Sequence, residues 1–198
     1  SRIFRTAYFE DPAYVPLLVR SLVLWKELNA REKAFQDDEN SEELLKMTGA
    51  LMIGAASDIE ESESESLEVY LRSARGKSVL GGTYASIREH GLEHEILSAA
   101  EVKKRYGCFN LDDSEIALYE KDAGVLIPEM CIVAYLRMAS DNGADLHYNE
   151  SLASYTRDDD GYFTIISSTD SIYRAKKIVL SVGAWAPKLY GDVLVTPT

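Results

Sequence analysis

The chain has 198 residues, with 21 Lys and Arg against 33 Asp and Glu, which gives a formal net charge of −12. Nucleic-acid backbones and anionic lipid surfaces would repel such a field, so neither nucleic acid nor a membrane is an expected partner. The apolar runs are too short to span a bilayer, and the composition is that of a globular chain with one large or two small domains.

The first residues lack the layout of a signal peptide, so we expect a protein that is not secreted. Its two cysteines, Cys108 and Cys131, lie in unlike contexts and do not indicate a disulfide framework. We therefore expect two reduced thiols.

In the first part of the chain, apolar residues at helical spacing predict a helix from about Ala13 to Arg31, with Pro16 in its first turn. The run "ALMIGA" at residues 50–55 predicts a strand. Two acidic insertions, Gln36–Glu43 and Asp58–Ser78, stand on either side of it. For the serine-rich second insertion, a solvated surface segment is favoured over an interaction tail or a phosphorylation cluster.

The middle of the chain mixes short helices with strands. A short helix is predicted at Ala85–His90, ended by Gly91, and "HEIL" predicts a strand at residues 94–97. Ser98 and Glu101 have the spacing of a capping box and predict the start of a helix. The runs "EIALYE" and "GVLI", residues 115–120 and 124–127, predict two further strands of an antiparallel sheet.

The last part of the chain predicts a helix, a meander and two parallel strands. Pro128 begins the helix and Gly143 ends it. A strand is predicted at residues 144–148, and an antiparallel meander at residues 151–175 with turns at "DDDG" and "STDS". The uninterrupted apolar run "KIVLSV" predicts a separate parallel strand buried on both faces. The fold class is therefore mixed, with α/β and antiparallel α+β parts.

Two arginines near the start of the chain are candidates for ligand binding. If the segment is helical or turn-like, the spacing of Arg2 and Arg5 places both guanidiniums on one side. Two planar forks would suit a carboxylate ligand. The alternative is that they pair with Glu10 or Asp11, and in so acidic a chain this alternative weighs more on sequence alone.

Familiar catalytic motifs are absent from the sequence. His90, His94 and His147 have no metal-ligand spacing, because Gly91 ends the helix between the first two, and they are interpreted as surface residues. The sequence contains no GxSxG, P-loop, CxxC, HExxH or GxGxxG motif. Gly81-Gly82 is not followed by the helix that a dinucleotide-binding loop requires.

The segment "KKIVLSVGAWAPKL" joins a strand pattern to small residues. A strand that ends in Gly183 and Ala184 presents nearly bare backbone, next to Trp185. Such backbone suits the close approach of another strand or of a ligand.

Five blocks together carry a family resemblance: "SRIFRTAYFEDPAYVPLLVRSLVLW", "TGALMIG", "REHGLEHEILSAAEVKKRY", "ALYEKDAGVLIPEMCIVAYLRMA" and "AKKIVLSVGAWAPKL". In this order they resemble the FAD-dependent amine oxidases of the sarcosine oxidase and pipecolate oxidase family. The resemblance implies a partial, Rossmann-like FAD-binding domain with a β-meander, plus an antiparallel-sheet substrate domain. Residues 1–44 and 128–198 would belong to the FAD-binding domain, and residues 45–127 to the substrate domain.

The resemblance also implies roles for single residues. Arg2 is similar to the arginine near the flavin ring, and Arg5 to the one that holds the substrate carboxylate. At the cofactor, the implied backbone contacts come from Leu152 at the adenine end and from the turn of Gly183, Ala184 and Trp185. Three further positions match the family and are interpreted as packing residues: Tyr119, Glu120 and Cys131.

The implied activity is oxidation of a secondary amino acid, sarcosine-like or pipecolate-like, at the C–N bond, with FAD as cofactor and imine and hydrogen peroxide as products. The family's GxGxxG unit, flavin-linking cysteine and active-site lysines have no match in the 198 residues. We therefore expect the segment alone to bind no stoichiometric FAD, to be inactive, and to self-associate or need a missing segment. A truncated non-catalytic relative, acting as a scaffold or partner subunit, is the alternative. The expected location is the cytoplasm or the peroxisome.

Overall fold

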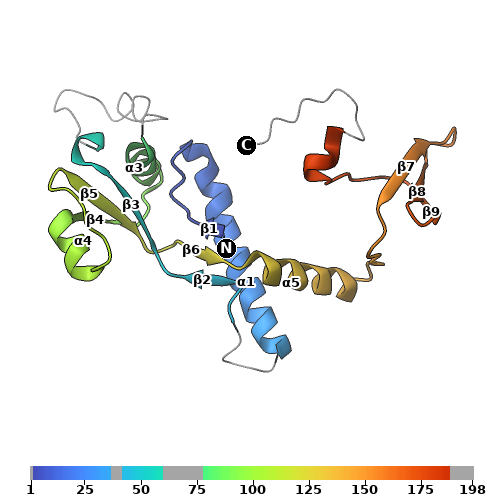
Figure 1. Cartoon of the computed structure of the whole chain (residues 1–198), viewed down its shortest axis with the longest axis horizontal. Helices are drawn as coiled ribbons and strands as arrows, with labels where there is room; N and C mark the ends of the chain where they lie inside the picture. Colours follow the sequence, from blue (N-terminus) through green and yellow to red (C-terminus); the bar gives the residue numbers. More distant parts are fainter. Residues whose placement is uncertain (1, 37–41, 60–77, 188–198) are drawn as a thin grey trace. The chain divides into compact units, whose positions relative to one another are not determined.

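The computed structural model describes residues 2–36, 42–59 and 78–187 (Figure 1). The chain divides into two compact units, Ser1–Gly143 and Ala144–Thr198. Most of the two acidic insertions, Gln36–Glu43 and Asp58–Ser78, lies outside the described residues. The domain boundaries expected at residues 44 and 127 stay predictions.

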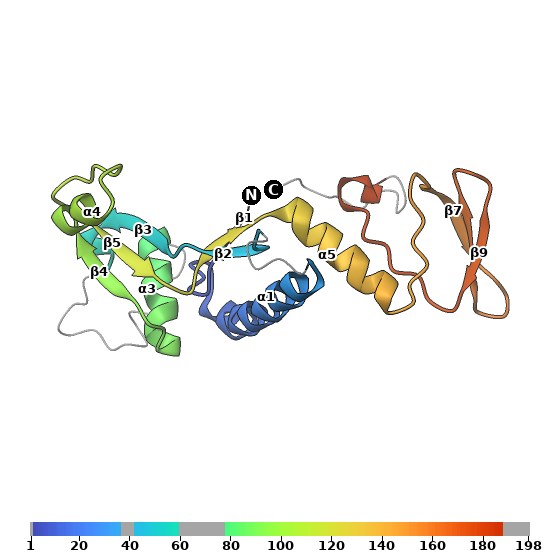
Figure 2. The ribbon, with the colours of Figure 1, turned by 90° about the horizontal axis from the view of Figure 1, so that it is seen from below.

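One small sheet and two helices pack together in the first unit (Figure 2). The sheet has the order β1-β6-β2, with both pairings antiparallel: β1 (Arg2–Phe4), β6 (Gly124–Leu126) and β2 (Leu45–Met47). The helices are α1 (Val15–Gln36) and α5 (Pro128–Asp141). Their shared core contains these buried side chains: Phe4, Leu22, Leu28, Leu44, Leu45, Cys131 and Ala134.

Local signals account for the ends of these two helices. The Asp11 side chain accepts a hydrogen bond from Ala13 N at 2.9 Å and caps a short 3-10 turn, η1 (Pro12–Tyr14), that leads into α1. The predicted first helix is confirmed, and it continues past Arg31 to Gln36. Pro128 begins α5 as predicted, and Gly143 follows its end with a φ of 83°. Among the described residues, no helix has the length and apolar character needed to cross a membrane.

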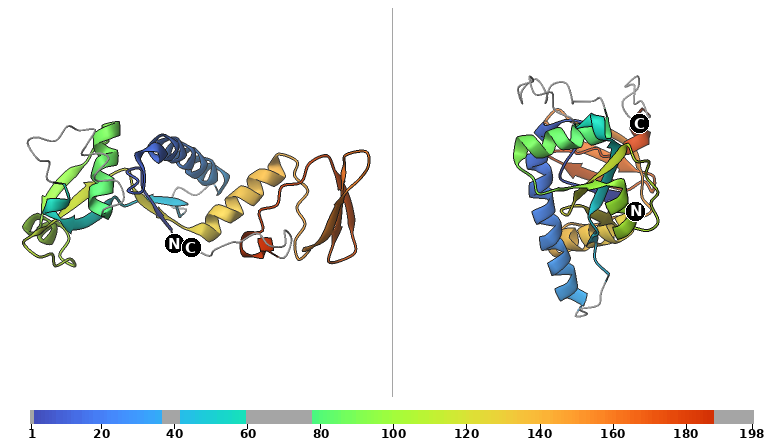
Figure 3. Two further views of the ribbon diagram at one scale, coloured as in Figure 1. Left: turned by 90° about the horizontal axis from the view of Figure 1, so that it is seen from above. Right: turned by 90° about the vertical axis from the view of Figure 1, so that its left-hand side faces the viewer.

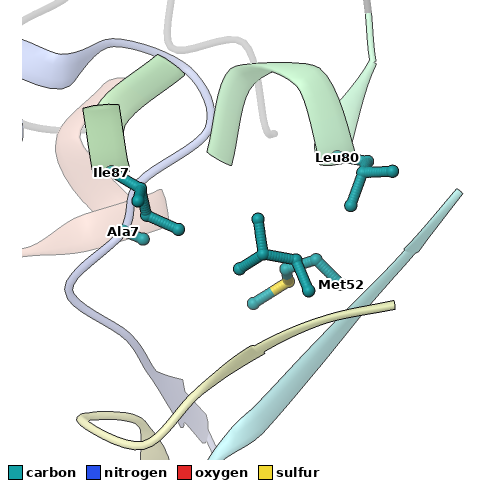
Figure 4. Packing of buried hydrophobic residues seen from close by; sticks show 5 residues of the cluster. Ala7, Met52, Leu80 and Ile87 are labelled. Carbon is teal, nitrogen blue, oxygen red and sulfur yellow. The ribbon is translucent and has the colours of Figure 1, made fainter. Parts of the chain in front are cut away.

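A second antiparallel sheet in this unit has a helix on each face (Figure 3). Its order is β3-β5-β4: β3 (Ala50–Ala55), β5 (Glu115–Glu120) and β4 (Glu95–Ser98). Met52 and Leu118 pack against α3 (Val79–His90), and Figure 4 shows Met52 facing Leu80 and Ile87 of that helix. Leu97 and Ala117 pack against Val102 of α4 (Ala99–Arg105). This alternation is that of a strand covered on both faces.

The strands β5 and β6 belong to different sheets. The sequence predicted two strands of one antiparallel sheet, and this part of the prediction is wrong. The chain passes from β5 to β6 through residues 121–123 and from β2 to β3 through residues 48–49 (Figure 1). Gly49 N donates to Ala123 O at 2.9 Å and joins the two crossing segments. The chain changes sheets there because β5 pairs with β3 and β4, whereas β6 pairs with β1 and β2.

Helix α3 is longer than predicted and contains both glycines of the Gly81-Gly82 pair. The helix begins at Val79, where the Ser78 side chain accepts a hydrogen bond from Gly81 N at 2.9 Å, and Gly91 ends it with a φ of 63°. The prediction of a start at Ala85 is therefore wrong. The predicted capping box of α4 is confirmed, since the Glu101 side chain accepts from Ser98 N at 2.8 Å and Ser98 Oγ accepts from Glu101 N.

The second unit is a three-stranded antiparallel meander, as predicted. Its order is β7-β8-β9: β7 (Leu152–Arg157), β8 (Phe163–Ser167) and β9 (Ile172–Ala175). Gly161 N donates to Asp158 O at 2.9 Å in the first turn, and Asp170 adopts a φ of 61° in the second. Both turns therefore use the polar and glycine residues on which the prediction rested.

The two parallel strands predicted in this unit are not formed. Residues 144–148 and 177–182 do not form strands, and every pairing between described strands is antiparallel. The prediction of burial on both faces is also wrong, because Val179 is 88% exposed. An apolar run becomes a strand only where a neighbouring backbone supplies its hydrogen bonds, and the described residues bring none beside these segments.

Candidate functional site

Arg5 lies between β1 and η1, in a segment that we call the arginine loop (residues 5–11). Its side chain is only 18% exposed, and its guanidinium lies over two aromatic rings, 5.0 Å from the Tyr8 centroid and 4.5 Å from that of Phe9. A guanidinium nitrogen stands 3.5 Å from Glu10 Oε2, and another stands 3.9 Å from Met52 Sδ. The pairing with Glu10 that the sequence offered as the alternative is therefore present.

Arg2 occupies a different environment. It belongs to β1, where it is exposed and pairs with Leu126 of β6. The expectation that Arg2 and Arg5 share one side depended on a helical or turn-like segment, and the strand geometry of Arg2 does not meet that condition. Arg2 is thus an exposed residue of the sheet, while Arg5 lies in the half-buried arginine loop.

A buried carboxylate holds one side of the arginine loop. Glu120, at the end of β5, is 1% exposed, and its Oε1 accepts hydrogen bonds from Thr6 N at 2.7 Å and from Ala7 N at 2.9 Å. The Thr6 hydroxyl donates to the same oxygen. The interpretation of Glu120 as a packing residue is therefore wrong. A sequence signal existed, because Glu120 falls on the same face of its strand as Ile116 and Leu118, where an acidic residue is unusual.

Helix α3 holds the other side of the loop through backbone carbonyls. Ser86 Oγ donates to Tyr8 O, and His90 Nε2 donates to Pro12 O at 2.9 Å. A Cβ placed on Gly82 would lie 2.1 Å from Phe9 O, so only glycine lets the helix approach this closely. Residues 82, 86 and 90 recur every four positions and form one stripe of the helix.

The remaining two packing interpretations are confirmed. Cys131 lies in the core between α1 and α5, with its Sγ 3.9 Å from Leu44 O, and burial raises the pKa of its thiol. Tyr119 packs beside Leu97 and Ala117, and its ring lies so close to Gly49 that a Cβ there would collide with it.

Apart from Arg2, the residues expected to contact the cofactor lie in the second unit. Leu152 begins β7, is half-buried, and pairs with Ser167. The turn Gly183–Trp185 is a 3-10 helix, η3, in which the Trp185 side chain is 64% exposed and the Trp185 backbone N–H donates to Val182 O at 3.0 Å. Gly183 has a φ of 51°, and no atom lies within 4 Å of the position that a Cβ would take.

Each of these features, taken within its own unit, is compatible with a contact to FAD. An open glycine turn allows a large planar group to reach the backbone, and a guanidinium such as that of Arg2 can stack on the face of an aromatic ring system. The pyrophosphate of such a cofactor is usually held at the helix N-terminus of a GxGxxG unit, and the 198 residues contain no such motif.

Comparison with known proteins gives a consistent result. The family described as "DAO: FAD dependent oxidoreductase" matches residues 1–198. The chain is 34% identical to monomeric sarcosine oxidase of Streptomyces avermitilis over 193 residues, which covers 98% of this chain and 43% of that protein. It is 27% identical to N-methyl-L-tryptophan oxidase of Citrobacter koseri over 197 residues, which covers 100% of this chain and 45% of that protein. The chain thus spans less than half the length of these curated relatives.

Solved structures share the fold at lower identity. NikD, titled an unusual amino acid oxidase essential for nikkomycin biosynthesis, matches 95% of this chain and 41% of its own with a TM-score of 0.68 and 22% identity. Glycine oxidase from Geobacillus kaustophilus matches 89% of this chain and 41% of its own with a TM-score of 0.64 and 18% identity. The mixed fold class and the family resemblance found in the sequence are confirmed. The chain belongs to the FAD dependent oxidoreductase family.

Proposed function

We propose that this chain is part of an FAD-dependent oxidase that acts on the C–N bond of a small secondary amino acid, sarcosine-like or pipecolate-like, and yields an imine and hydrogen peroxide. Family membership supports the cofactor and the reaction class. The names of two relatives, monomeric sarcosine oxidase and N-methyl-L-tryptophan oxidase, support the substrate class, because both specify N-methylated amino acids.

The observation that carries the proposal is the environment of Arg5. Its guanidinium is largely removed from water and held over two aromatic rings, which limits its rotation. The 3.5 Å separation from Glu10 Oε2 is longer than a charge-assisted hydrogen bond of about 2.7–2.9 Å, so the donors are not fully engaged by that partner. An amino acid carboxylate would therefore find a planar, partly desolvated fork at Arg5.

The other residues have proposed roles toward the cofactor. When bound, the flavin supplies the hydride acceptor for oxidation of the amine. Arg2 would lie near the flavin ring, and Leu152 would offer its backbone to the adenine end. Gly183, Ala184 and Trp185 would let the chain approach the cofactor closely. Residues 1–44 and 128–198 would form the FAD-binding part, with residues 45–127 in the substrate domain.

Substitution of Arg5 tests the substrate role. In the full-length protein that carries this segment, Arg5→Ala should weaken the binding of an acidic amine, that is, an amine substrate with a carboxylate. We expect a loss of about 1.5–3 kcal/mol in binding free energy, the usual contribution of a charged hydrogen bond. This corresponds to a rise in KM of about 10- to 150-fold. The control is Arg20→Ala, an exposed arginine of α1 that pairs with Glu27 on the same helix. An unchanged KM with normal flavin absorbance would exclude Arg5 from the site.

A second candidate is a non-catalytic relative that acts as a scaffold or partner subunit. Because no GxGxxG motif is present to hold the pyrophosphate, we expect residues 1–198 alone to bind no stoichiometric FAD and to show no oxidase activity. We also expect them to self-associate or to need a missing segment. The visible spectrum and the solution mass of the 198-residue product measure this, and a yellow, active monomer would contradict it.

A full-length protein that shows neither flavin absorbance nor peroxide production would favour the scaffold. A location in the cytoplasm or the peroxisome stays a prediction, and microscopy of the tagged full-length protein tests it.

A further inference from the structure

Glu120 is an unusual residue for the end of a core strand, because its side chain is acidic and buried. A carboxylate that is 1% exposed is costly to bury. Among the described residues, Oε1 accepts from two backbone N–H groups and one hydroxyl, none of them a cation, and Oε2 is buried without a hydrogen-bond partner. An apolar residue, such as Leu118 on the same face, would pack there without this cost. The carboxylate therefore serves the groups that it binds.

Those groups lie immediately after Arg5 in the chain. The bonds from Thr6 N and Ala7 N set the direction in which the backbone leaves Arg5, and Ala7 is itself buried against Met52. The two rings that lie over the guanidinium, Tyr8 and Phe9, follow at once. On α3, Ser86 Oγ donates to Tyr8 O and Gly82 lies close to Phe9 O, so Glu120 and the helix both restrain the arginine loop.

We propose that Glu120 is a positioning residue that fixes the arginine loop so that Arg5 is oriented for a substrate carboxylate before the substrate arrives. This inference rests on the proposed function of Arg5. Glu120 acts through the N–H groups of Thr6 and Ala7. Holding a binding group in its bound orientation lowers the entropy cost of binding, and small displacements of such a group have large effects on rate.

Two variants of Glu120 test the proposal in the full-length protein. Glu120→Gln keeps the shape and one neutral acceptor, so the loop remains but is held less strongly, because charge-assisted hydrogen bonds are about twice as strong as neutral ones. We expect KM for an acidic amine to rise about 5-fold in Glu120→Gln and about 30-fold in Glu120→Ala, with a smaller change in kcat. The substrate is whichever of sarcosine, pipecolate and N-methyl-L-tryptophan has the highest kcat/KM.

A comparison of substrates with and without a carboxylate distinguishes a positioning role of Glu120 from a general loss of structure. For the amide of the same amino acid, which offers no carboxylate to Arg5, Glu120→Gln should leave kcat/KM within about twofold of the parent. In an Arg5→Ala background, Glu120→Gln should add no further rise in KM for the acid, because the two residues act on one contact. Equal losses for acid and amide would overturn the proposal.

A measurement without turnover covers variants that lose activity. Hydrogen–deuterium exchange should become at least tenfold faster at Thr6 and Ala7 in Glu120→Ala, and unchanged exchange there would overturn the proposal.

If Glu120→Ala does not fold, Thr6→Val removes the hydroxyl donor alone and should raise KM for the acid but not for the amide. If Arg5→Ala itself leaves KM unchanged, the proposed function of Arg5 fails. If Arg5→Ala raises KM and Glu120→Gln does not, only the role of Glu120 fails.

Discussion

The side chain of Asn29 hydrogen-bonds to both backbone groups of Leu45. Asn29 Nδ2 donates to Leu45 O at 3.0 Å, and Asn29 Oδ1 accepts from Leu45 N at 3.3 Å. The same oxygen accepts from Leu44 N at 2.9 Å. One amide on α1 therefore holds the start of β2 to the helix, beside the apolar packing of Leu45 against Leu22.

We expect Asn29→Ala to lower the free energy of unfolding by about 1–3 kcal/mol, because it leaves half-buried backbone donors and an acceptor without partners. Asn29→Asp should be intermediate in cost, since the carboxylate keeps both acceptor roles but repels Leu45 O. Urea unfolding followed by circular dichroism measures the change. Asn110→Ala, in the exposed loop before β5, is the control and should shift stability by less than about 0.5 kcal/mol. Equal midpoints for the Asn29 and Asn110 variants would contradict the expectation.

Because α3 approaches the arginine loop closely, we expect a single methyl group added at Gly82 to lower the stability of the protein. A Cβ at Gly82 would lie 2.1 Å from Phe9 O and 2.9 Å from Phe9 C, and both are backbone atoms that cannot rotate away. We expect Gly82→Ala to destabilise the protein by about 1–3 kcal/mol, as overpacking does, and to raise KM for an acidic amine as the loop shifts.

Gly107→Ala is the matched control for this change. The nearest atom to its Cβ position is Lys103 O at 4.0 Å, so the added methyl group has room. Thermal unfolding of the two variants, with kinetics on the same samples, makes the comparison. A Gly82→Ala protein as stable as Gly107→Ala would show that the loop can move away from the helix at little cost.

Glu150 predicts a pH dependence for the second unit. Hydrogen bonds from Ser167, Tyr173 and Thr169 lower the pKa of this carboxyl to about 2, and the Tyr173 hydroxyl lies 2.9 Å from Glu150 Oε2. His147 Nδ1 also lies 3.3 Å from that oxygen. Since the folded-state pKa is below the unfolded value of about 4.3, the contribution of Glu150 is complete above that value and is lost as the pH falls toward about 2.

We therefore expect the unfolding temperature of the meander to fall between about pH 5 and pH 2, and Glu150→Gln to flatten that fall. Differential scanning calorimetry at stepped pH values measures both. Asp113→Asn, in the exposed turn before β5, removes the same charge outside this network and should leave the slope unchanged. If Glu150→Gln and the parent show parallel slopes, the hydrogen bonds to Glu150 do not contribute to acid stability.

The sequence by itself determined the elements whose signals lie within a few residues of one another. Pro128 at the start of α5 and the Ser98–Glu101 capping box are local, because each satisfies backbone groups of its own first turn. The meander is local in the same sense, since its polar turns join strands that pair with their neighbours in the chain. The five sequence blocks were also sufficient to recognise the family, and the family match over residues 1–198 confirms that recognition.

The tertiary structure decided the features that depend on distant residues. Glu120 could be interpreted as a packing residue until its bond to Thr6, 114 positions away, was in place. The close approach of α3 to Phe9 at Gly82 also depends on residues far apart in the chain, and no local propensity expresses it. The run at residues 177–182 shows the converse case. Its apolar pattern permits a strand, but a strand needs backbone partners from elsewhere, and a pattern within one segment cannot supply them.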